Sequence, residues 1–251
     1  MKDTEIKEGD IFILGQHKLA CGSSSDHTLL QKLLGDDKVR LALSDPPYGV
    51  SYVESKNGFN HELSCPIVIA NDNISNSDDY LKFSVAWLKA IIPFLESKNN
   101  FYIFNCDKMI FSLKEAMEES GVKLSQLLIW VKSQAVIGRL DYLPQHELIA
   151  YGWHGTHLFR KSKAKSVLFY PKPSRSKLHS TMKPVPLLRE LILNSSNLNE
   201  IVFDGFGGSG STLIACEHLS RKCRMVELDP IHCLTIIKRW EKVTGQTAIK
   251  L

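Results

Sequence analysis

Short apolar runs alternate along most of the chain with stretches in which apolar residues recur every three or four positions. The runs predict buried strands, and the periodic stretches predict helices that cover a sheet. The predicted strands are 39–44, 100–105, 124–131, 147–153, 200–203 and 224–228. The predicted helices are 78–96, 108–120, 185–193, 212–219 and 231–243. This alternation indicates an α/β domain with a mostly parallel sheet that is covered on both faces.

Two stretches depart from this pattern. Residues 49–79 are rich in Ser, Asn and Gly and have little apolar periodicity, so we predict a mobile loop there. Residues 152–178 combine basic residues with aromatic ones, and Pro171 and Pro173 argue against a long helix at their end. We predict that this second stretch forms loops or a hairpin that engages a partner.

The composition is that of an ordinary globular protein. The chain has 251 residues, of which 43% are hydrophobic and 23% are charged, so we expect one domain over residues 1–251 and exclude disorder. No apolar run reaches the roughly 18–20 residues that span a bilayer, and the first residues lack a hydrophobic leader. The six cysteines contain no C-x-x-C pair. We therefore expect a soluble cytoplasmic protein without a metal or a membrane anchor.

Basic residues are concentrated in one part of the chain. Residues 148–189 contain nine Lys or Arg residues and no Asp or Glu, whereas the remainder has 22 basic and 27 acidic residues. A basic segment on an otherwise acidic body favours a polyanionic partner such as DNA, with a solvated basic surface as the alternative.

A glycine-rich turn joins a predicted strand to a predicted helix late in the chain. Residues 205–210 match G-x-G-x-x-G, and Glu227 follows at the end of the next strand. Such a turn lets a backbone approach a ligand closely, and the acid suits ribose hydroxyls, so a nicotinamide dinucleotide and S-adenosylmethionine both fit. Ser211 stands where a P-loop has its lysine, which argues against ATP. Only 41 residues follow Gly210, which is unusual for a dehydrogenase.

The tetrapeptide Asp45-Pro46-Pro47-Tyr48 directly follows the predicted strand 39–44. The two prolines stiffen the turn, and the carboxyl end of a strand is where open α/β sheets hold ligands. A stiff turn there directs two acceptors, the Asp45 carboxylate and the Pro46 carbonyl, at an amino group. The Tyr48 ring provides a surface on which a planar base can stack.

Taken together, these motifs resemble those of amino-methylating DNA methyltransferases of the permuted β group. Asp-Pro-Pro-Tyr comes first, and Asp204 with Phe206-Gly207-Gly208-Ser209-Gly210 comes last. His179-Ser180-Thr181-Met182-Lys183-Pro184 is similar to that family's H-x-T-x-K-P element, and residues 9–22 are similar to its amino-terminal hairpin. The resemblance implies a Rossmann-like sheet with helices on both faces, an inserted target-recognition segment and S-adenosylmethionine as cofactor.

The resemblance also assigns roles to residues. It implies that catalysis rests on Asp45, Pro46, Pro47 and Tyr48. It implies that the cofactor contacts Cys21, Gly22, His179, Thr181, Lys183, Asp204, Phe206, Gly207, Gly208, Ser209, Gly210, Ser211, Thr212, Glu227 and Asp229. The candidates for DNA binding are Arg160, Lys161, Lys163, Lys165, Lys172, Arg175 and Lys177. One position departs from the family, because Ser23 stands where an acid commonly contacts the cofactor's adenine, and Asp26 is the alternative.

The implied reaction is methyl transfer from S-adenosylmethionine to the N6 amino group of adenine in double-stranded DNA after base flipping. Asp at the first motif position favours adenine over the N4 amino group of cytosine. Cytosine C5 chemistry is disfavoured because it needs a Pro-Cys nucleophile and the chain has only Cys65-Pro66. A nicotinamide dehydrogenase and a non-catalytic DNA-binding protein remain alternatives. A homodimer and a cognate restriction endonuclease are compatible with this reading.

Overall fold

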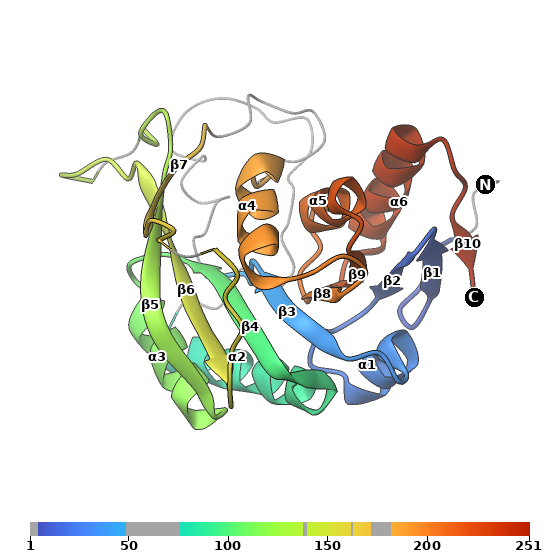
Figure 1. Cartoon of the computed structure of the whole chain (residues 1–251), viewed down its shortest axis with the longest axis horizontal. Coiled ribbons are helices and arrows are strands. Elements are labelled where there is room, and N and C mark those ends of the chain that lie inside the picture. Colours follow the sequence, from blue (N-terminus) through green and yellow to red (C-terminus); the bar gives the residue numbers. More distant parts are fainter. Residues whose placement is uncertain (1–4, 49–75, 138–139, 162, 172–181) are drawn as a thin grey trace.

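The computed structural model describes residues 5–48, 76–137, 140–161, 163–171 and 182–251, and every structural statement below concerns these ranges. They form one ten-stranded sheet with the strand order β10-β1-β2-β9-β8-β3-β4-β6-β5-β7 (Figure 1). The strands are β1 (Ile11–Leu14), β2 (His17–Cys21), β3 (Val39–Ser44), β4 (Leu95–Asn105), β5 (Val122–Val131), β6 (His146–His154), β7 (Val167–Phe169), β8 (Ile201–Asp204), β9 (Lys222–Glu227) and β10 (Ile249–Lys250).

Helices cover both faces of the sheet. They are α1 (His27–Leu34), α2 (Ser77–Ile91), α3 (Ile110–Glu119), α4 (Val185–Ser195), α5 (Ser211–Leu219) and α6 (Pro230–Thr244). Figure 1 shows α1, α2 and α3 on one face and α4, α5 and α6 on the other. Alternate residues of β4 supply the two cores, because Phe101 and Ile103 pack with α2 while Tyr102 and Phe104 face the α4 side. The predicted α/β architecture is therefore confirmed.

The sheet is parallel in its centre and antiparallel near both edges. Strands β2, β9, β8, β3 and β4 pair in parallel, so their carboxyl ends share one edge of the sheet. The β1–β2 and β5–β6 pairs are antiparallel, as are β1–β10 and β4–β6. The prediction of a mostly parallel sheet therefore holds for the centre, whereas the flanks are mixed, because β5 and β7 at one edge pair in parallel. The β1–β2 pair is antiparallel because its connection is a short hairpin, which cannot join parallel strands.

One predicted helix, 78–96, is too long. The α-helix ends at Ile91, a 3₁₀ turn covers Ile92–Phe94, and β4 begins at Leu95, five residues before the predicted strand. Pro93 explains the change, because it has no N–H to donate and its ring clashes with the preceding helical turn. The other predicted elements begin and end within two residues of the observed ones.

The amino-terminal hairpin forms as the resemblance implied, with Ile11 opposite Ala20 and Leu14 opposite His17. Helix α1 follows and was not predicted. Asp26 caps it by accepting hydrogen bonds from the Thr28 N–H at 2.8 Å and the Leu29 N–H at 3.2 Å. A short helix of this kind depends on its cap and on packing, which periodicity over eight residues does not reveal.

Both stretches that depart from the strand–helix pattern contain residues of helices or strands. The predicted loop 49–79 is wrong for its last residues, because Asn76 caps α2 and the helix starts at Ser77; residues 49–75 lie outside the described ranges. The stretch 152–178 begins inside β6 and contains β7, which pairs in parallel with β5, and residues 172–178 are not described. Gly152 is required in β6 because a Cβ there would lie 2.0 Å from the Lys123 carbonyl oxygen. The prediction of loops or a hairpin is therefore wrong for β7, which joins the sheet by pairing with β5, while the end of β6 agrees with the predicted strand 147–153.

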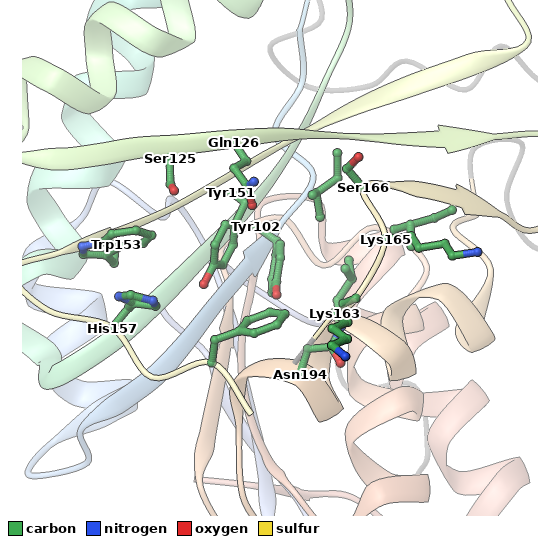
Figure 2. Close-up of a pocket in the computed structure, with 15 residues that line it drawn as sticks. Tyr102, Ser125, Gln126, Tyr151, Trp153, His157, Lys163, Lys165, Ser166 and Asn194 are labelled. Carbon is green, nitrogen blue, oxygen red and sulfur yellow. The ribbon is translucent and has the colours of Figure 1, made fainter. Parts of the chain in front are cut away.

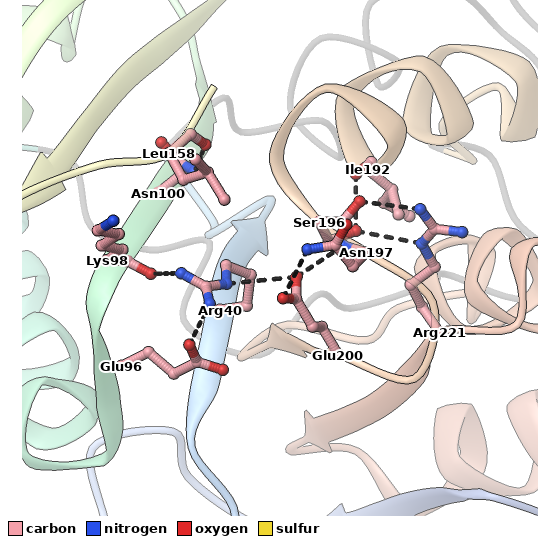
Figure 3. A network of polar contacts seen from close by, with 10 residues as sticks. All are labelled: Arg40, Glu96, Lys98, Asn100, Leu158, Ile192, Ser196, Asn197, Glu200 and Arg221. Carbon is pink, nitrogen blue, oxygen red and sulfur yellow. Dashed lines mark hydrogen bonds and ion pairs between the residues drawn. The ribbon is translucent and has the colours of Figure 1, made fainter. Parts of the chain in front are cut away.

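A charged cluster fixes the amino-terminal ends of the central strands. Arg40 on β3 pairs with Glu96 on β4 and with Glu200 just before β8, and it also donates to the carbonyl of Lys98 (Figure 3). These contacts join β8, β3 and β4 at the edge opposite the carboxyl ends. Among the described helices, none combines the length and the apolar character needed to cross a membrane.

Candidate active site

Polar side chains from several segments meet at the carboxyl edge of the central strands. Residues 45–48 follow β3, residues 205–210 follow β8, and Glu227 ends β9. The chain leaves β3 toward β4 on one side, while β8 and β9, which come late in the sequence, lie on the other. This is a topological switch point, where open α/β sheets bind their ligands.

Asp45 has one engaged oxygen and one free oxygen. Its Oδ2 accepts a hydrogen bond from Lys183 Nζ at 2.5 Å. Its Oδ1 is buried and has no hydrogen-bond partner among the described residues. Burial raises the pKa of the Asp45 carboxyl, and the Lys183 ammonium only partly offsets this. A buried acceptor without a donor costs about 1–3 kcal/mol, so the geometry fits a ligand that brings an N–H group.

Lys183 lies between two carboxylates. Its Nζ is also 3.2 Å from Glu147 Oε2, and Glu147 Oε1 is 2.9 Å from Lys132 Nζ. Burial alone would lower the pKa of Lys183, but Asp45 and Glu147 outweigh it and raise that pKa. Burial would raise the pKa of Glu147, but Lys183 and Lys132 together lower it. The resemblance implies a cofactor contact for Lys183, and the structure places its ammonium against the Asp45 carboxylate.

Sequence reasoning missed Glu147 and Lys132. They lie at the base of the β5–β6 hairpin, where the Lys132 N–H donates to the Gln145 carbonyl at 2.8 Å. Neither belongs to a recognisable motif. The available signal was weak: a charged residue at each end of the connection between two apolar strands.

The turn after Asp45 is packed against the helices on one face. Pro46 is buried, and the Tyr48 ring packs against the core that contains Tyr80. Asn105, at the end of β4, donates to the Tyr80 hydroxyl at 2.8 Å. Burial raises the pKa of the Tyr48 hydroxyl well above its usual value, so the ring stays neutral at ordinary pH. Tyr48 therefore offers an uncharged aromatic surface beside Asp45.

The glycine-rich turn is tightly built. Gly208 and Gly210 have φ angles of 52° and 75°, which disfavour side chains, and a Cβ on Gly207 would lie 2.9 Å from Met225. Phe206 fixes the turn from the other side by packing edge-on against Trp87, with ring centroids 5.5 Å apart. The Ser44 hydroxyl accepts from the Gly205 N–H at 3.1 Å and so joins this turn to the end of β3.

Asp204 and the hydroxyl residues of the turn are mostly committed to the protein itself. Asp204 Oδ1 accepts from the Phe206 N–H at 3.1 Å, and burial raises the Asp204 pKa to about 7. Arg239 donates to the Ser209 carbonyl at 2.7 Å and to the Ser211 hydroxyl at 3.1 Å. Thr212, the second residue of α5, is buried. These residues fix the shape of the turn, which lies at the carboxyl edge of the central strands.

Glu227 is the acid at the end of β9. Its Oε2 accepts from the Gly208 N–H at 2.6 Å and its Oε1 accepts from the Asp229 N–H at 2.9 Å. Each carboxylate oxygen has a second lone pair, so these bonds leave capacity for ribose hydroxyls. Asp229 caps α6 by accepting from the Ile231 N–H at 2.7 Å. The structure thus gives both acids a local role in addition to the predicted one.

The remaining predicted cofactor residues divide into three groups. The Cys21 side chain is fully buried, and the Gly22 N–H donates to the Glu227 carbonyl at 2.8 Å, so this strand end lies beside Glu227. Asp26 caps α1 through its Oδ1, so this acid also has a local role in the structure. His179 and Thr181 lie outside the described residues. A glycine cradle that a Cβ would obstruct and an acid at the next strand end together fit S-adenosylmethionine.

The basic segment borders a hollow on the α4 side of the sheet. Lys163 and Lys165 line this hollow of about 460 Å³ together with Trp153 and Phe159 (Figure 2). The Trp153 ring stacks on His157 with centroids 3.9 Å apart. Arg160 and Lys161 are exposed, and Lys161 Nζ lies 3.5 Å from Glu190. Lys172, Arg175 and Lys177 lie outside the described ranges.

Comparison with known proteins gives consistent results. A family model for DNA methylases matches residues 39–238. Type II methyltransferase M.HpaI of Haemophilus parainfluenzae is 26% identical over 76% of this chain, which spans 64% of that relative's length. The crystal structure of an M1.HpyAVI–SAM complex superposes with a TM-score of 0.63 at 21% identity, covering 88% of this chain and 98% of that one. PvuII DNA methyltransferase, a cytosine-N4-specific protein, superposes with a TM-score of 0.68 at 16% identity, covering 91% and 90%. The fold is that of these solved structures, and one of them contains the cofactor that the sequence predicts.

Proposed function

The chain belongs to the family of DNA methylases, and from that premise we propose that it transfers a methyl group from S-adenosylmethionine to the N6 amino group of adenine in double-stranded DNA. The observation that carries the proposal is the free, buried Oδ1 of Asp45 beside the glycine-rich turn. Within the family, the order of the motifs supports membership of the permuted β group.

The amino group needs help because its lone pair is conjugated into the base and is a poor nucleophile. Asp45 Oδ1 and the Pro46 carbonyl accept its two hydrogens and localise the lone pair, so that orientation and electrostatics supply most of the catalysis. Once it carries the transferred methyl group, the nitrogen would have to lose a proton to become neutral. The raised pKa of Asp45 suits that carboxylate to receive the proton.

The base must leave the duplex to reach Asp45. Flipping costs a few kcal/mol, and stacking on the Tyr48 ring returns about 1–3 kcal/mol. The cofactor, when bound, supplies an electrophilic methyl group. The Glu227 carboxylate would hold it by accepting from its ribose hydroxyls, and the turn 205–210, which has glycine at four of its positions, would let it approach the backbone closely.

Cytosine N4 is the second candidate, because cytosine and adenine present the same N=C–NH₂ edge. PvuII DNA methyltransferase, which has the same fold, is cytosine-N4-specific. The resemblance of Asp45-Pro46-Pro47-Tyr48 to the adenine-type motif favours adenine here. A dehydrogenase gives no role to Asp45 or Tyr48, and a silent DNA-binding protein gives none to the free Asp45 oxygen.

The product identifies the reaction. Incubation with DNA and methyl-labelled S-adenosylmethionine, followed by digestion and mass spectrometry of the nucleosides, is expected to yield N6-methyladenine. N4-methylcytosine would correct the base while keeping the reaction class. The absence of any methylated nucleoside would contradict the proposal.

The basic segment is the proposed DNA-binding surface. Replacing Lys161, Lys163 and Lys165 together by alanine is expected to weaken binding to all DNA sequences alike. The reason is that lysines in contact with phosphates position the protein on the duplex but do not read the base sequence. The slope of log affinity against log salt should flatten by up to about 2.7, at roughly 0.9 per lost phosphate contact.

A matched control removes the same charge from the other face. The exposed residues Lys82, Lys89 and Lys114 lie on α2 and α3, and their replacement by alanine should leave the salt slope unchanged. An equal slope in both triple variants would mean that the basic segment is only a solvated surface. DNA titrations at several salt concentrations measure the difference.

A further inference from the structure

Four charged side chains of alternating sign form a continuous chain that ends at Asp45. Lys132 pairs with Glu147 at 2.9 Å, Glu147 pairs with Lys183 at 3.2 Å, and Lys183 pairs with Asp45 at 2.5 Å. The side chains of Lys132, Glu147, Lys183 and Asp45 are 7%, 17%, 9% and 28% exposed. The chain therefore runs from the base of the β5–β6 hairpin to the edge of the candidate active site.

The ammonium groups of both lysines lie over aromatic rings. Lys132 Nζ lies 5.4 Å from the Trp130 ring and Lys183 Nζ lies 5.0 Å from the Phe104 ring, both close enough for cation–π attraction. Burying charges is expensive, and replacing a buried ion pair by neutral residues is often neutral or stabilising. Stability alone therefore gives a poor account of four charges at this place, and their common end point is Asp45.

We propose that Lys132 and Glu147 are positioning residues for methyl transfer: they fix Lys183, which holds Asp45 Oδ2 and leaves Oδ1 facing the target amino group. The inference rests on the proposed function. Glu147 gives the Lys183 ammonium a second carboxylate, so that its position is set from two sides. Lys132 neutralises Glu147, so that Lys183 is not drawn away from Asp45.

The charges also set the protonation of Asp45. The groups that act on it are Lys183 and Lys132, which lower its pKa, and Glu147, which raises it in the same direction as burial. Neighbouring groups on other elements are Asp204 on β8 and Tyr80 on α2. Methyl transfer needs the Asp45 carboxylate, so the single-turnover rate falls as the pH drops through its pKa.

Two variants therefore shift the acidic limb of the rate profile in opposite directions. Glu147→Gln removes an anion, lowers the Asp45 pKa and moves the limb to lower pH. Lys132→Met removes a cation, raises that pKa and moves the limb to higher pH, in each case by about half a unit or more. In Glu147→Gln, Lys183 loses one of its two carboxylates, and in Lys132→Met it is drawn from Asp45 toward Glu147. In both variants the single-turnover rate on the pH plateau is therefore expected to fall about tenfold or more. Affinity for S-adenosylmethionine should stay within about twofold.

The double variant Lys132→Met/Glu147→Gln removes one charge of each sign, so the net charge and the approximate size of the pair are kept. It tests the positioning role even if a single variant does not fold. Its acidic limb should lie between those of the single variants, and its rate should remain about tenfold or more below wild type. Lys132→Arg, which preserves the charge, should restore most of the rate. The exposed pair Lys114 and Glu118 on α3 provides the control, since Lys114→Met and Glu118→Gln should keep the wild-type profile.

The outcomes separate the two claims. A wild-type protein that methylates no DNA contradicts the proposed function. A wild-type protein that methylates DNA contradicts the positioning role if the two single variants shift the limb in the same direction, or if the double variant keeps the wild-type rate. A purely structural role would lower thermal stability and the amount of active protein without moving the limb in opposite directions.

Discussion

The Asp45→Ala variant is expected to transfer methyl groups on the order of a hundredfold or more slowly than the wild-type protein, with its affinity for S-adenosylmethionine within a few-fold. The lost carboxylate acts on the base: it supplies the free Oδ1 acceptor and the negative charge beside the nitrogen that becomes positive. Single-turnover rates and calorimetric titration of the cofactor measure the two quantities separately.

The structure adds a condition to this experiment. Removing Asp45 leaves the buried Lys183 ammonium with Glu147 as its remaining carboxylate partner among the described residues, which lowers stability. Asp45→Asn is the matched variant, because it keeps the size and one acceptor oxygen while it removes the charge. Both variants should bind the cofactor and fold. Near-normal methyl transfer in either variant would contradict the central role of the carboxylate.

Glu227→Ala is expected to weaken S-adenosylmethionine binding by about 1.5–3 kcal/mol, or roughly 10–150-fold, while DNA binding stays within a few-fold. The reason is twofold: the ribose hydroxyls lose a charged acceptor, and the Gly208 and Asp229 N–H groups lose theirs. The glycine-rich turn then loses one of its hydrogen bonds to β9 and keeps the bond from the Gly207 N–H to the Val226 carbonyl at 2.9 Å.

Asp229→Ala serves as the comparison. This substitution removes the cap of α6, at a cost of about 1 kcal/mol in folding stability. It keeps the backbone N–H of residue 229, which donates to Glu227. Its cofactor affinity should therefore change less than that of Glu227→Ala. The reverse order would show that Asp229 is the ribose-binding acid, and calorimetric titration of both variants decides between them.

The sequence already located the parts of the site that depend on local backbone constraints. Strand β3 was predicted with its observed bounds, and the stiff Asp45–Tyr48 turn at its end follows from two prolines. The turn at 205–210 follows from glycines whose positive φ angles and close packing the structure displays. Each of these features is set by a few neighbouring residues, so a linear pattern reveals it.

Predictions from local sequence patterns were wrong where a proline or the pairing with a distant strand decided the structure. The predicted helix 78–96 follows an apolar spacing that continues past Pro93, although α2 ends at Ile91. The basic stretch 152–178 contributes to β6 and contains β7, because both strands pair with β5. Whether neighbouring strands run parallel, as in the centre and in the β5–β7 pair, or antiparallel depends on which strands meet. Strand pairing is a long-range choice, and alternation of strands and helices predicts the class of sheet without its flanks.

The sequence alone does not predict the contact between Lys183 and Asp45. The two residues are 138 positions apart, and the motif around Lys183 resembles a cofactor-binding element. Glu147 and Lys132 carried no motif at all. Their roles arise because the fold buries four charges together. In the low dielectric of a protein interior, each buried charge must pair with an opposite charge a few ångströms away. Composition and spacing determined which chemistry this chain has available, whereas the packing of β5, β6 and the segment before α4 decided which carboxylate each ammonium meets.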